Sequence, residues 1–313
     1  MVLDADQTTA SKLVVRRFIA GLSGDEDRAE VVDRFVTSAS LREKVASFDA
    51  EYPGFTVVLT DIFGEGGTVV VRFFTALPER PAGARTHASS RAGGAAVRAV
   101  RGPPDGLPER RSKPRQPNME GIAMCRVEGG KIVDAWVHSD VMTQVFAVIG
   151  GAELVEAPVG SAPSDPAPGA RLTDPPVAGG PYLSEPAEAR ANRALVERFI
   201  ATLDGRPKSA ADLSRFTTDP SLVRQVLRTE AGFPCYRFTV ERIVAERDRV
   251  GMLFGTLQTH TGEYLGVAPT GARVSLSGQA IYRVERGKIV EHWLHADTWS
   301  LMEQLGAVGP AAK

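Results

Sequence analysis

The chain has 313 residues, of which 43% are hydrophobic and 24% charged, and its formal net charge is −1. This length suits two domains with cores of their own, and a net charge near zero gives no electrostatic reason to expect a nucleic acid or an anionic membrane as partner. The two cysteines, Cys125 and Cys235, lie far apart without metal-ligand spacing, and no signal pattern or membrane-length apolar run occurs, so we expect a cytoplasmic protein without a metal or a disulfide framework.

The first predicted element, the N-terminal helix, contains a motif that recurs later in the chain. "RFIA" at residues 17–20 returns at residues 198–201, an offset of 181, and the same offset pairs Tyr52-Pro53 with Phe233-Pro234. The similarity resumes at residues 126–141 and 283–298, now at an offset of 157, where ten of sixteen pairs are identical. A fixed internal period indicates a structural repeat. The sequence therefore predicts two copies of one domain.

The change of offset places 24 extra residues in the first copy. They fall in the segment 77–118, which is rich in Arg, Pro, Gly and Ala and has no apolar period, so we expect a mobile basic loop. An anion-binding arm and a hairpin scrambled at the level of the gene are the alternatives. A Pro/Ala/Gly-rich segment, 151–188, is typical of an extended linker. We thus predict domains at 8–150 and 189–309.

The second copy has no insert, and its elements follow in clear order. Helical periodicity covers "PAEARANRALVERFIATLDG", and two shorter helices are predicted in "SAADLSRFTT" and "PSLVRQVLRTEAG". Four segments of period two follow, and the chain closes with the helical "TWSLMEQLGAV". Helices followed by antiparallel strands predict an α+β fold: tandem cone-shaped domains, each a curved antiparallel sheet with helices packed on one face and room for a small molecule.

The second copy resembles the SnoaL-like polyketide cyclases, also called ester cyclases, of the nuclear transport factor 2-like fold. The resemblance is carried by "RFIATL", "FTTDPSLVRQVL", "GFPCYRFTVERIVAERDRV", "THTGEYLGVAPTGARV" and "IYRVERGKIVEHWLHAD". The first copy matches at "VVRRFIAGL", "RFVTSASLREKVASFDAEYPGFTV" and "RVEGGKIVDAWVHSD", but the basic insert replaces "HTGEYLGVAPTG". The family closes polyketide rings of secondary metabolites without cofactors or metals, using an Asp as acid–base, and often forms dimers.

The resemblance implies that Asp297 is the acid–base residue. His295 would orient it or donate to a substrate carbonyl, and His260 is a second candidate donor. Trp293 would form an apolar wall, and the other expected substrate-binding residues are Glu263, Tyr264, Gln279 and Tyr282. The chemistry suits a carboxylate in an apolar pocket, because burial raises its pKa toward working pH. The hydrophobic substrate would be a small molecule.

Alternation along a regular strand places residues 289, 291, 293, 295 and 297 on one face. The weaker first-copy equivalents are Asp140, His138 and Trp136. Each expectation has a structural alternative. Asp297 precedes a helix and Asp is a preferred N-cap, the tryptophans suit a core, and His260 lies in a hairpin where it could be exposed.

Three functions follow from these patterns. The first is a cofactor-free cyclase, isomerase or lyase, with the two copies packed sheet to sheet as an intramolecular pseudo-dimer. The second is a non-catalytic binding or scaffolding protein of the same fold. The third, an epoxide hydrolase or epoxide-opening cyclase, requires a second carboxylate, for which Glu291 is the nearby candidate. Some family members have an acidic residue directly after the Trp, where this chain has Leu294 and Val137, and this lowers the expectation of epoxide chemistry.

Overall fold

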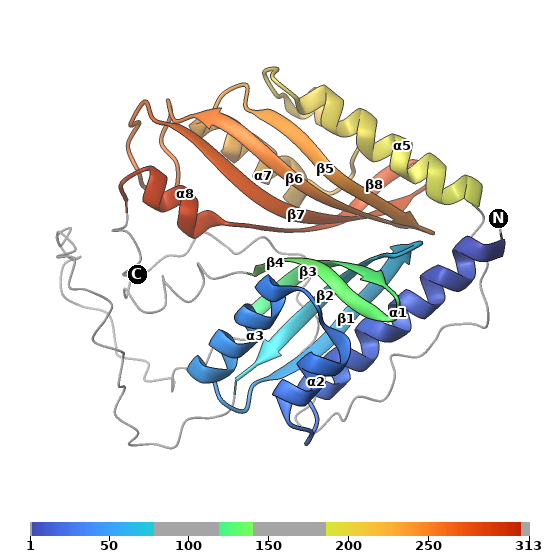
Figure 1. Cartoon of the computed structure of the whole chain (residues 1–313). Coiled ribbons are helices and arrows are strands. Elements are labelled where there is room, and N and C mark those ends of the chain that lie inside the picture. Colours follow the sequence, from blue (N-terminus) through green and yellow to red (C-terminus); the bar gives the residue numbers. More distant parts are fainter. Residues whose placement is uncertain (1, 78–118, 140–185, 308–313) are drawn as a thin grey trace, which may run out of the picture.

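The computed structural model describes residues 2–77, 119–139 and 186–307. Two sets of helices, each followed by a four-stranded antiparallel sheet, make up these residues (Figure 1). The elements of the first copy are α1 (Val2–Leu22), α2 (Arg28–Phe35), α3 (Ala39–Glu51), β1 (Thr56–Glu65), β2 (Thr68–Ala76), β3 (Met119–Glu128) and β4 (Lys131–Ser139).

The second copy repeats this order and adds a closing helix. Its elements are α5 (Pro186–Leu203), α6 (Ala210–Leu213), α7 (Pro220–Gly232), β5 (Arg237–Glu246), β6 (Arg249–Thr259), β7 (Arg273–Glu285), β8 (Lys288–Ala296) and α8 (Thr298–Gln304). The strand orders are β1-β2-β3-β4 and β5-β6-β7-β8, so every neighbouring pair is also consecutive in sequence. The predicted α+β tandem architecture is confirmed.

The irregularities of the two sheets coincide, which supports the duplication more strongly than the strand count does. The register shifts between Leu59 and Asp61 in β1 and between Val240 and Arg242 in β5, positions that are 181 residues apart. It shifts again next to Val127 in the first copy and next to Val284 in the second, which are 157 residues apart. Bulges add a residue to one strand and bend it, so the two sheets bend at equivalent positions.

Local sequence explains where the elements begin and turn. Asp27, Ser38 and Asp219 each precede a helix and accept hydrogen bonds from its first backbone N–H groups, as expected of short polar N-caps. The hairpin between β7 and β8 turns at Arg286 and Gly287, with φ of 51° and 71°. Two positive φ values are typical of the tight turns that join antiparallel strands.

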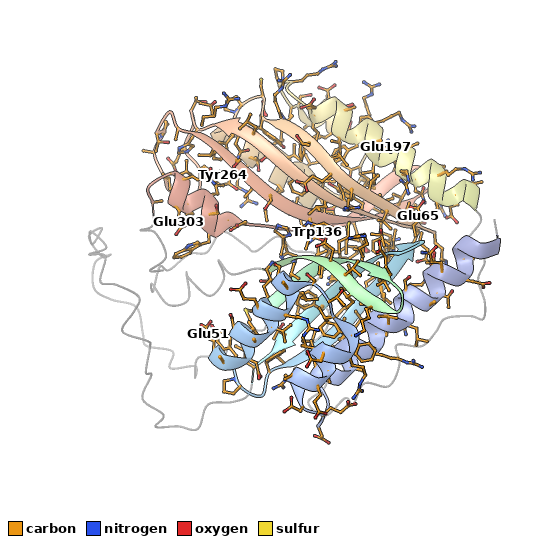
Figure 2. All side chains as sticks on the ribbon, in the orientation of Figure 1. Glu51, Glu65, Trp136, Glu197, Tyr264 and Glu303 are labelled. Carbon is orange, nitrogen blue, oxygen red and sulfur yellow. The ribbon has the colours of Figure 1, made fainter. Side chains whose placement is uncertain are left out.

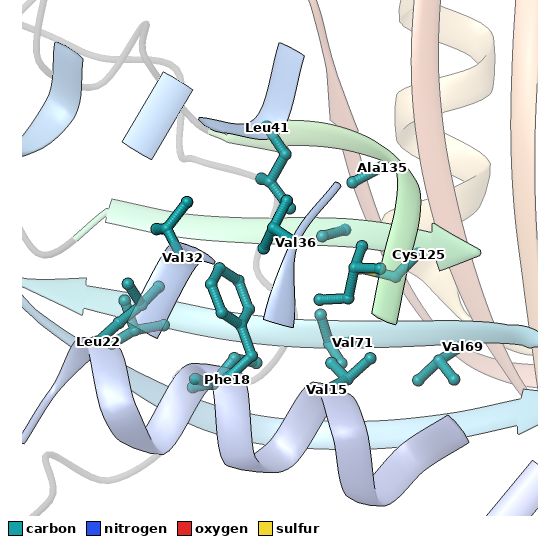
Figure 3. Packing of buried hydrophobic residues seen from close by; sticks show 14 of the residues in the cluster. Val15, Phe18, Leu22, Val32, Val36, Leu41, Val69, Val71, Cys125 and Ala135 are labelled. Carbon is teal, nitrogen blue, oxygen red and sulfur yellow. The ribbon is translucent and has the colours of Figure 1, made fainter. Parts of the chain in front are cut away.

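Each copy has its own apolar core between the helices and one face of its sheet. In the first copy Val15, Phe18 and Leu22 of α1 pack against Val69 and Val71 of β2 (Figure 3). In the second copy the corresponding helix α5 packs along β5 and β6, and its Phe199 ring also meets Tyr282 of β7. The buried residues of this core include Phe199, Leu203, Met252, Ala280 and Tyr282.

A third apolar cluster joins the two sheets on the faces that the helices leave uncovered. It contains Phe63, Val70, Ile122 and Met124 from the first copy, and Val244, Leu253, Ile281 and Trp293 from the second. The two sheets face each other with the helices on the outer sides, and Trp136 lies between the sheets (Figures 1 and 2). Each sheet thus has helices against one face and packs against the other copy with part of its other face.

The predicted basic insert and most of the predicted linker lie outside the described residues, so the domain boundaries remain predictions. No helix in the part of the chain that the structure describes is both long enough and apolar enough to cross a membrane.

Candidate functional site

Strand β6 changes character along the face that it turns to the helices. Val250, Met252 and Phe254 belong to the second copy's core, but the next residues on the same face, Thr256 and Gln258, are polar and also buried. Side chains two residues apart in a strand share a face. A polar patch therefore closes an otherwise apolar interior, and His260 directly follows it.

His260 is fully buried, with 0% of its surface exposed. Its Nδ1 accepts a hydrogen bond from the backbone N–H of Thr270 at 3.2 Å and lies 3.1 Å from the Thr270 hydroxyl. An Nδ1 that accepts from a backbone N–H cannot carry a proton in neutral imidazole, so the proton is on Nε2. That Nε2–H has no hydrogen-bond partner among the described residues.

Gln258 provides a second unpaired donor on the same face. Its exposed fraction is 4%, its Oε1 lies 3.5 Å from the Thr256 hydroxyl, and its Nε2 is buried without a protein partner among the described residues. A buried polar group that lacks a partner costs about 1–3 kcal/mol of stability. These two donors come from residues two positions apart, and a bound hydrogen-bond acceptor would satisfy them.

The loop after β6 keeps His260 inside. The N–H groups of Thr261 and Gly262 both donate to the carbonyl of Gly232, at 3.1 and 3.0 Å. A Cβ at Gly262 would lie 1.9 Å from the Ala231 carbonyl oxygen, so this close approach requires glycine. Phe233 then packs against the His260 ring, with a distance of 5.0 Å between the ring centroids.

Apolar side chains surround the end of the domain that contains Gln258 and His260. A buried cluster there includes Phe233, Tyr236 and Val274 with Leu301 and Met302 of α8. Tyr264 is partly buried against Phe233, and its ring is labelled in Figure 2. Burial raises the pKa of the Tyr264 hydroxyl, so this residue stays neutral. Glu263, expected beside it, is exposed.

A second buried polar group joins α7 to β8. His292 is 2% exposed, and its Nδ1 lies 2.7 Å from Asp219 Oδ2 while its Nε2 lies 2.6 Å from Gln225 Oε1. Burial acts to raise the pKa of Asp219, but hydrogen bonds from His292 and Ser221, together with the charge of His292, lower it to about 2. Both ring nitrogens are occupied, so this group ties the N-cap of α7 to the sheet.

The structure does not give Asp297 the apolar surroundings expected of an acid–base residue. Asp297 is exposed, and its Oδ1 accepts the backbone N–H of Ser300 at 3.0 Å as the N-cap of α8. The expected enclosed environment is therefore wrong, because the strand ends before this residue and the chain turns into a helix. A proton-transfer role for Asp297 stays a prediction from the resemblance.

The expected common face of β8 holds from Glu291 to His295 and is wrong at Ile289. The register shifts by one residue between Glu291 and Ile289, so Ile289 packs in the core under the helices while Trp293 packs in the cluster between the sheets. Trp293 and the buried His295 thus face away from the second copy's interior. A one-residue slip moves every later side chain to the other face.

The remaining expected residues divide between these two regions. Tyr282 lies in the core under the helices, whereas Gln279 donates across to the first copy, reaching Trp136 O and His138 Nδ1, each at 2.9 Å. Burial and the Lys44 charge lower the pKa of His138, partly against the effect of Asp297. Asp140 lies outside the described residues.

Asp297 lines two hollows, and neither of them is lined by Gln258 or His260. One, of about 450 Å³, lies between the copies and is lined by Lys44, Trp136, His138 and Trp299 among others. The other, of about 380 Å³, lies along β5, β6 and β7. Within the described residues, no group of three or more His, Cys, Asp or Glu side chains could hold a metal ion.

Sequence reasoning missed Gln258, Asp219, Gln225 and His292. The signal for Gln258 was present, because the alternation that marks Val250, Met252 and Phe254 as buried continues to residues 256, 258 and 260. The pairing of Asp219 with His292 joins residues 73 positions apart and had no local signal.

The fold defines a class of α+β domain in which helices pack on one face of a curved antiparallel sheet. The comparison with protein families agrees: residues 218–305 match the family described as SnoaL-like polyketide cyclase. The resemblance seen in the sequence is thereby confirmed for this part of the chain. It includes β6, the loop after it and β8.

Solved structures similar to this chain include AclR from Streptomyces galilaeus, with 28% identity over 40% of this chain and 87% of AclR, at a TM-score of 0.36. IdmH from Streptomyces antibioticus is 22% identical over 37% of this chain and 98% of IdmH, with a TM-score of 0.33. A SnoaL-like polyketide cyclase from Agrobacterium tumefaciens is 20% identical over 38% and 93%, with a TM-score of 0.26. None of the curated proteins compared with the chain matches it.

Proposed function

We propose that the second copy binds a small hydrophobic carbonyl compound and acts on it as a cofactor-free cyclase or isomerase. The proposal is supported by the family match of residues 218–305. Ring closure by an aldol reaction and isomerisation next to a carbonyl share one requirement, which is to stabilise the negative charge that develops on the carbonyl oxygen.

One observation carries the proposal. The Nε2 atoms of Gln258 and His260 are buried donors with no protein partner in the described part of the chain. They lie at the polar end of an apolar interior, where a hydrogen bond to an oxyanion is stronger than in water. The Thr270 backbone N–H holds the His260 ring in the tautomer that donates from Nε2. A substrate carbonyl oxygen between these donors would satisfy both of them.

The chemistry also needs a group that takes the proton from the carbon beside the carbonyl. The resemblance assigns this role to Asp297. Glu291 does not serve as a second carboxylate, because Arg283 binds both of its oxygens, at 2.8 and 2.9 Å. The hydrogen bonds from Arg283 lower the pKa of Glu291. An epoxide-opening mechanism with two free carboxylates is therefore not proposed.

A matched pair of ligands tests the carbonyl site. Acetylnaphthalene has a ketone, and ethylnaphthalene has nearly the same shape without one. Calorimetric titration should show tighter binding of the ketone by the wild-type protein, and His260→Phe should remove the difference. Equal affinity of the wild-type protein for both compounds would contradict a carbonyl site.

The alternative is a binding protein of the same fold without turnover. The exposed position of Asp297 and its hydrogen bond to Ser300 favour this alternative. Ketone binding through Gln258 and His260 is common to both functions. Proton–deuterium exchange at the ketone's α-carbon, followed by NMR, separates them: an enzyme accelerates the exchange and a binding protein does not.

The two copies are proposed to work as an intramolecular pseudo-dimer. Support comes from the apolar cluster shared by the sheets and from ion pairs between the copies, such as Asp61 with Arg249 at 2.8 Å. In this arrangement the first copy packs against the face of the second sheet that the helices leave uncovered.

A further inference from the structure

The interface between the two sheets joins faces that are related by duplication but no longer alike. Strands β1 and β2 correspond to β5 and β6 at an offset of 181 residues, and β3 and β4 correspond to β7 and β8 at an offset of 157. In a pair of identical subunits every contact would occur twice. The contacts that differ between the copies therefore show which pairings the interface permits.

Shape is the first difference. Val70 and Gly251 are equivalent positions in contact with each other, so they lie where the two copies meet on their approximate twofold axis. A Cβ added at Gly251 would lie 2.9 Å from Val70 Cγ2 and 3.0 Å from the Phe63 ring. The space thus holds the side chains of the first copy only. Two first-copy faces would bring two valines into the same place, and two second-copy faces would leave a gap between glycines.

The neighbouring position repeats this complementarity. Phe63 fills the space over Gly251, and its equivalent in the second copy is the smaller Val244, which lies in the same cluster. On one side of the axis a large residue, Phe63, lies over a glycine, Gly251. The equivalent positions on the other side hold two medium-sized residues, Val244 and Val70. The faces therefore fit each other and do not fit themselves.

Charge is the second difference. Asp61 of the first copy pairs with Arg249 of the second, with 2.8 Å between Oδ2 and Nε. The second-copy equivalent of Asp61 is Arg242. A pairing of two second-copy faces would place Arg249 opposite Arg242, and like charges in a partly buried contact are destabilising.

Hydrogen bonding is the third difference. Gln279 is fully buried, and its Nε2 donates to the carbonyls of Ile122 and Trp136 and to Nδ1 of His138, at 3.2, 2.9 and 2.9 Å. Its equivalent in the first copy is Ile122 itself. A pairing of two first-copy faces would place isoleucine at both positions and lose these hydrogen bonds across the interface.

We propose that the two sheet faces have diverged into the complementary halves of one heterotypic interface. Each copy pairs with the other copy of the chain and rejects a second copy of its own kind. The duplicated chain thereby contains its own dimerisation partner and closes its association surface. This inference rests on the contacts between the sheets and does not depend on catalysis.

The test exchanges residues between equivalent positions in the full chain. Gly251→Val should lower the Tm by roughly 3–10 °C, because overpacking a buried contact is destabilising. Gly255→Val is the matched control: it lies on the same strand and face, and the nearest atom to a Cβ there is 3.6 Å away. The control should leave the Tm nearly unchanged.

Exchanging the residues at all four equivalent positions should then restore the fit between the two faces. Phe63→Val, Val70→Gly, Val244→Phe and Gly251→Val together reverse the roles of the copies. The proposal expects the fourfold variant to regain most of the Tm lost in Gly251→Val. A fourfold variant whose loss of Tm equals the sum of the losses of the four single variants would overturn the proposal. A Gly251→Val variant with the Tm of the wild type would also overturn it.

Discussion

Replacing Gln258 by Met should stabilise the protein while weakening its binding of a ketone. The buried Nε2 of Gln258 has no partner in the described part of the chain, and its Oε1 has one weak contact, 3.5 Å from the Thr256 hydroxyl. Methionine has a similar length and shape and no amide. The substitution therefore removes an unpaired polar group and retains the packing.

The magnitude follows from the energies of buried polar groups. Leaving a donor unsatisfied costs about 1–3 kcal/mol, while a weak neutral hydrogen bond returns about 1 kcal/mol or less. We expect the free energy of unfolding of the ligand-free protein to rise by about 1 kcal/mol in Gln258→Met. The loss of one donor to the ketone should weaken binding by about 1 kcal/mol, roughly fivefold in Kd.

Urea unfolding and calorimetric titration with acetylnaphthalene measure the two quantities. Gln225→Met is the matched control, because the Oε1 of Gln225 is bonded to His292 at 2.6 Å. That variant should lose stability by about 1–3 kcal/mol, since it leaves an imidazole nitrogen unpaired. A Gln258→Met protein that is less stable than the wild type and binds the ketone equally well would refute the reasoning.

Three further predictions concern single groups. The pKa of Asp219 falls from 3.8 to about 2 on folding. Ionised Asp219 therefore adds about 2 kcal/mol to the free energy of unfolding above pH ~4, and this contribution is lost as the pH falls toward 2. In Asp219→Asn, the free energy of unfolding should not show this loss between pH ~4 and ~2. Burial raises the pKa of Cys125 to about 12, so a thiol reagent should label the exposed Cys235 in the native protein and Cys125 only after unfolding; rapid labelling of both would contradict the core packing. Asp297→Ala should lower stability by about 1 kcal/mol while Asp297→Asn, also a good N-cap, should not; equal losses would contradict the capping role.

The repeat and the element order could be predicted because they depend on local signals. The repeated "RFIA" and the alternation in β6 are patterns within short stretches of sequence. Caps such as Asp219 likewise lie directly before their helices. Period-two patterns and turn residues fix which segments become strands. The α+β class followed from that order.

The site was harder to predict because it depends on register and on distant contacts. The shift in β8 moves Trp293 to the face between the two sheets, and nothing in the alternation around it marks the extra residue. Both faces of β8 are covered, so buried residues occur on each. The alternation of apolar residues therefore does not show which side chains face the helices. The partners of His292 and Gln279 come from other elements and, for Gln279, from the other copy.

The most direct measurement is the ¹⁵N–¹H NMR spectrum of the His260 imidazole in the full chain, assigned by comparison with His260→Phe. We expect the ring proton on Nε2, with a resonance that moves downfield when acetylnaphthalene is added and stays in place with ethylnaphthalene. A ring protonated at Nδ1, or an Nε2 proton that responds to neither compound at saturating concentration, would contradict it.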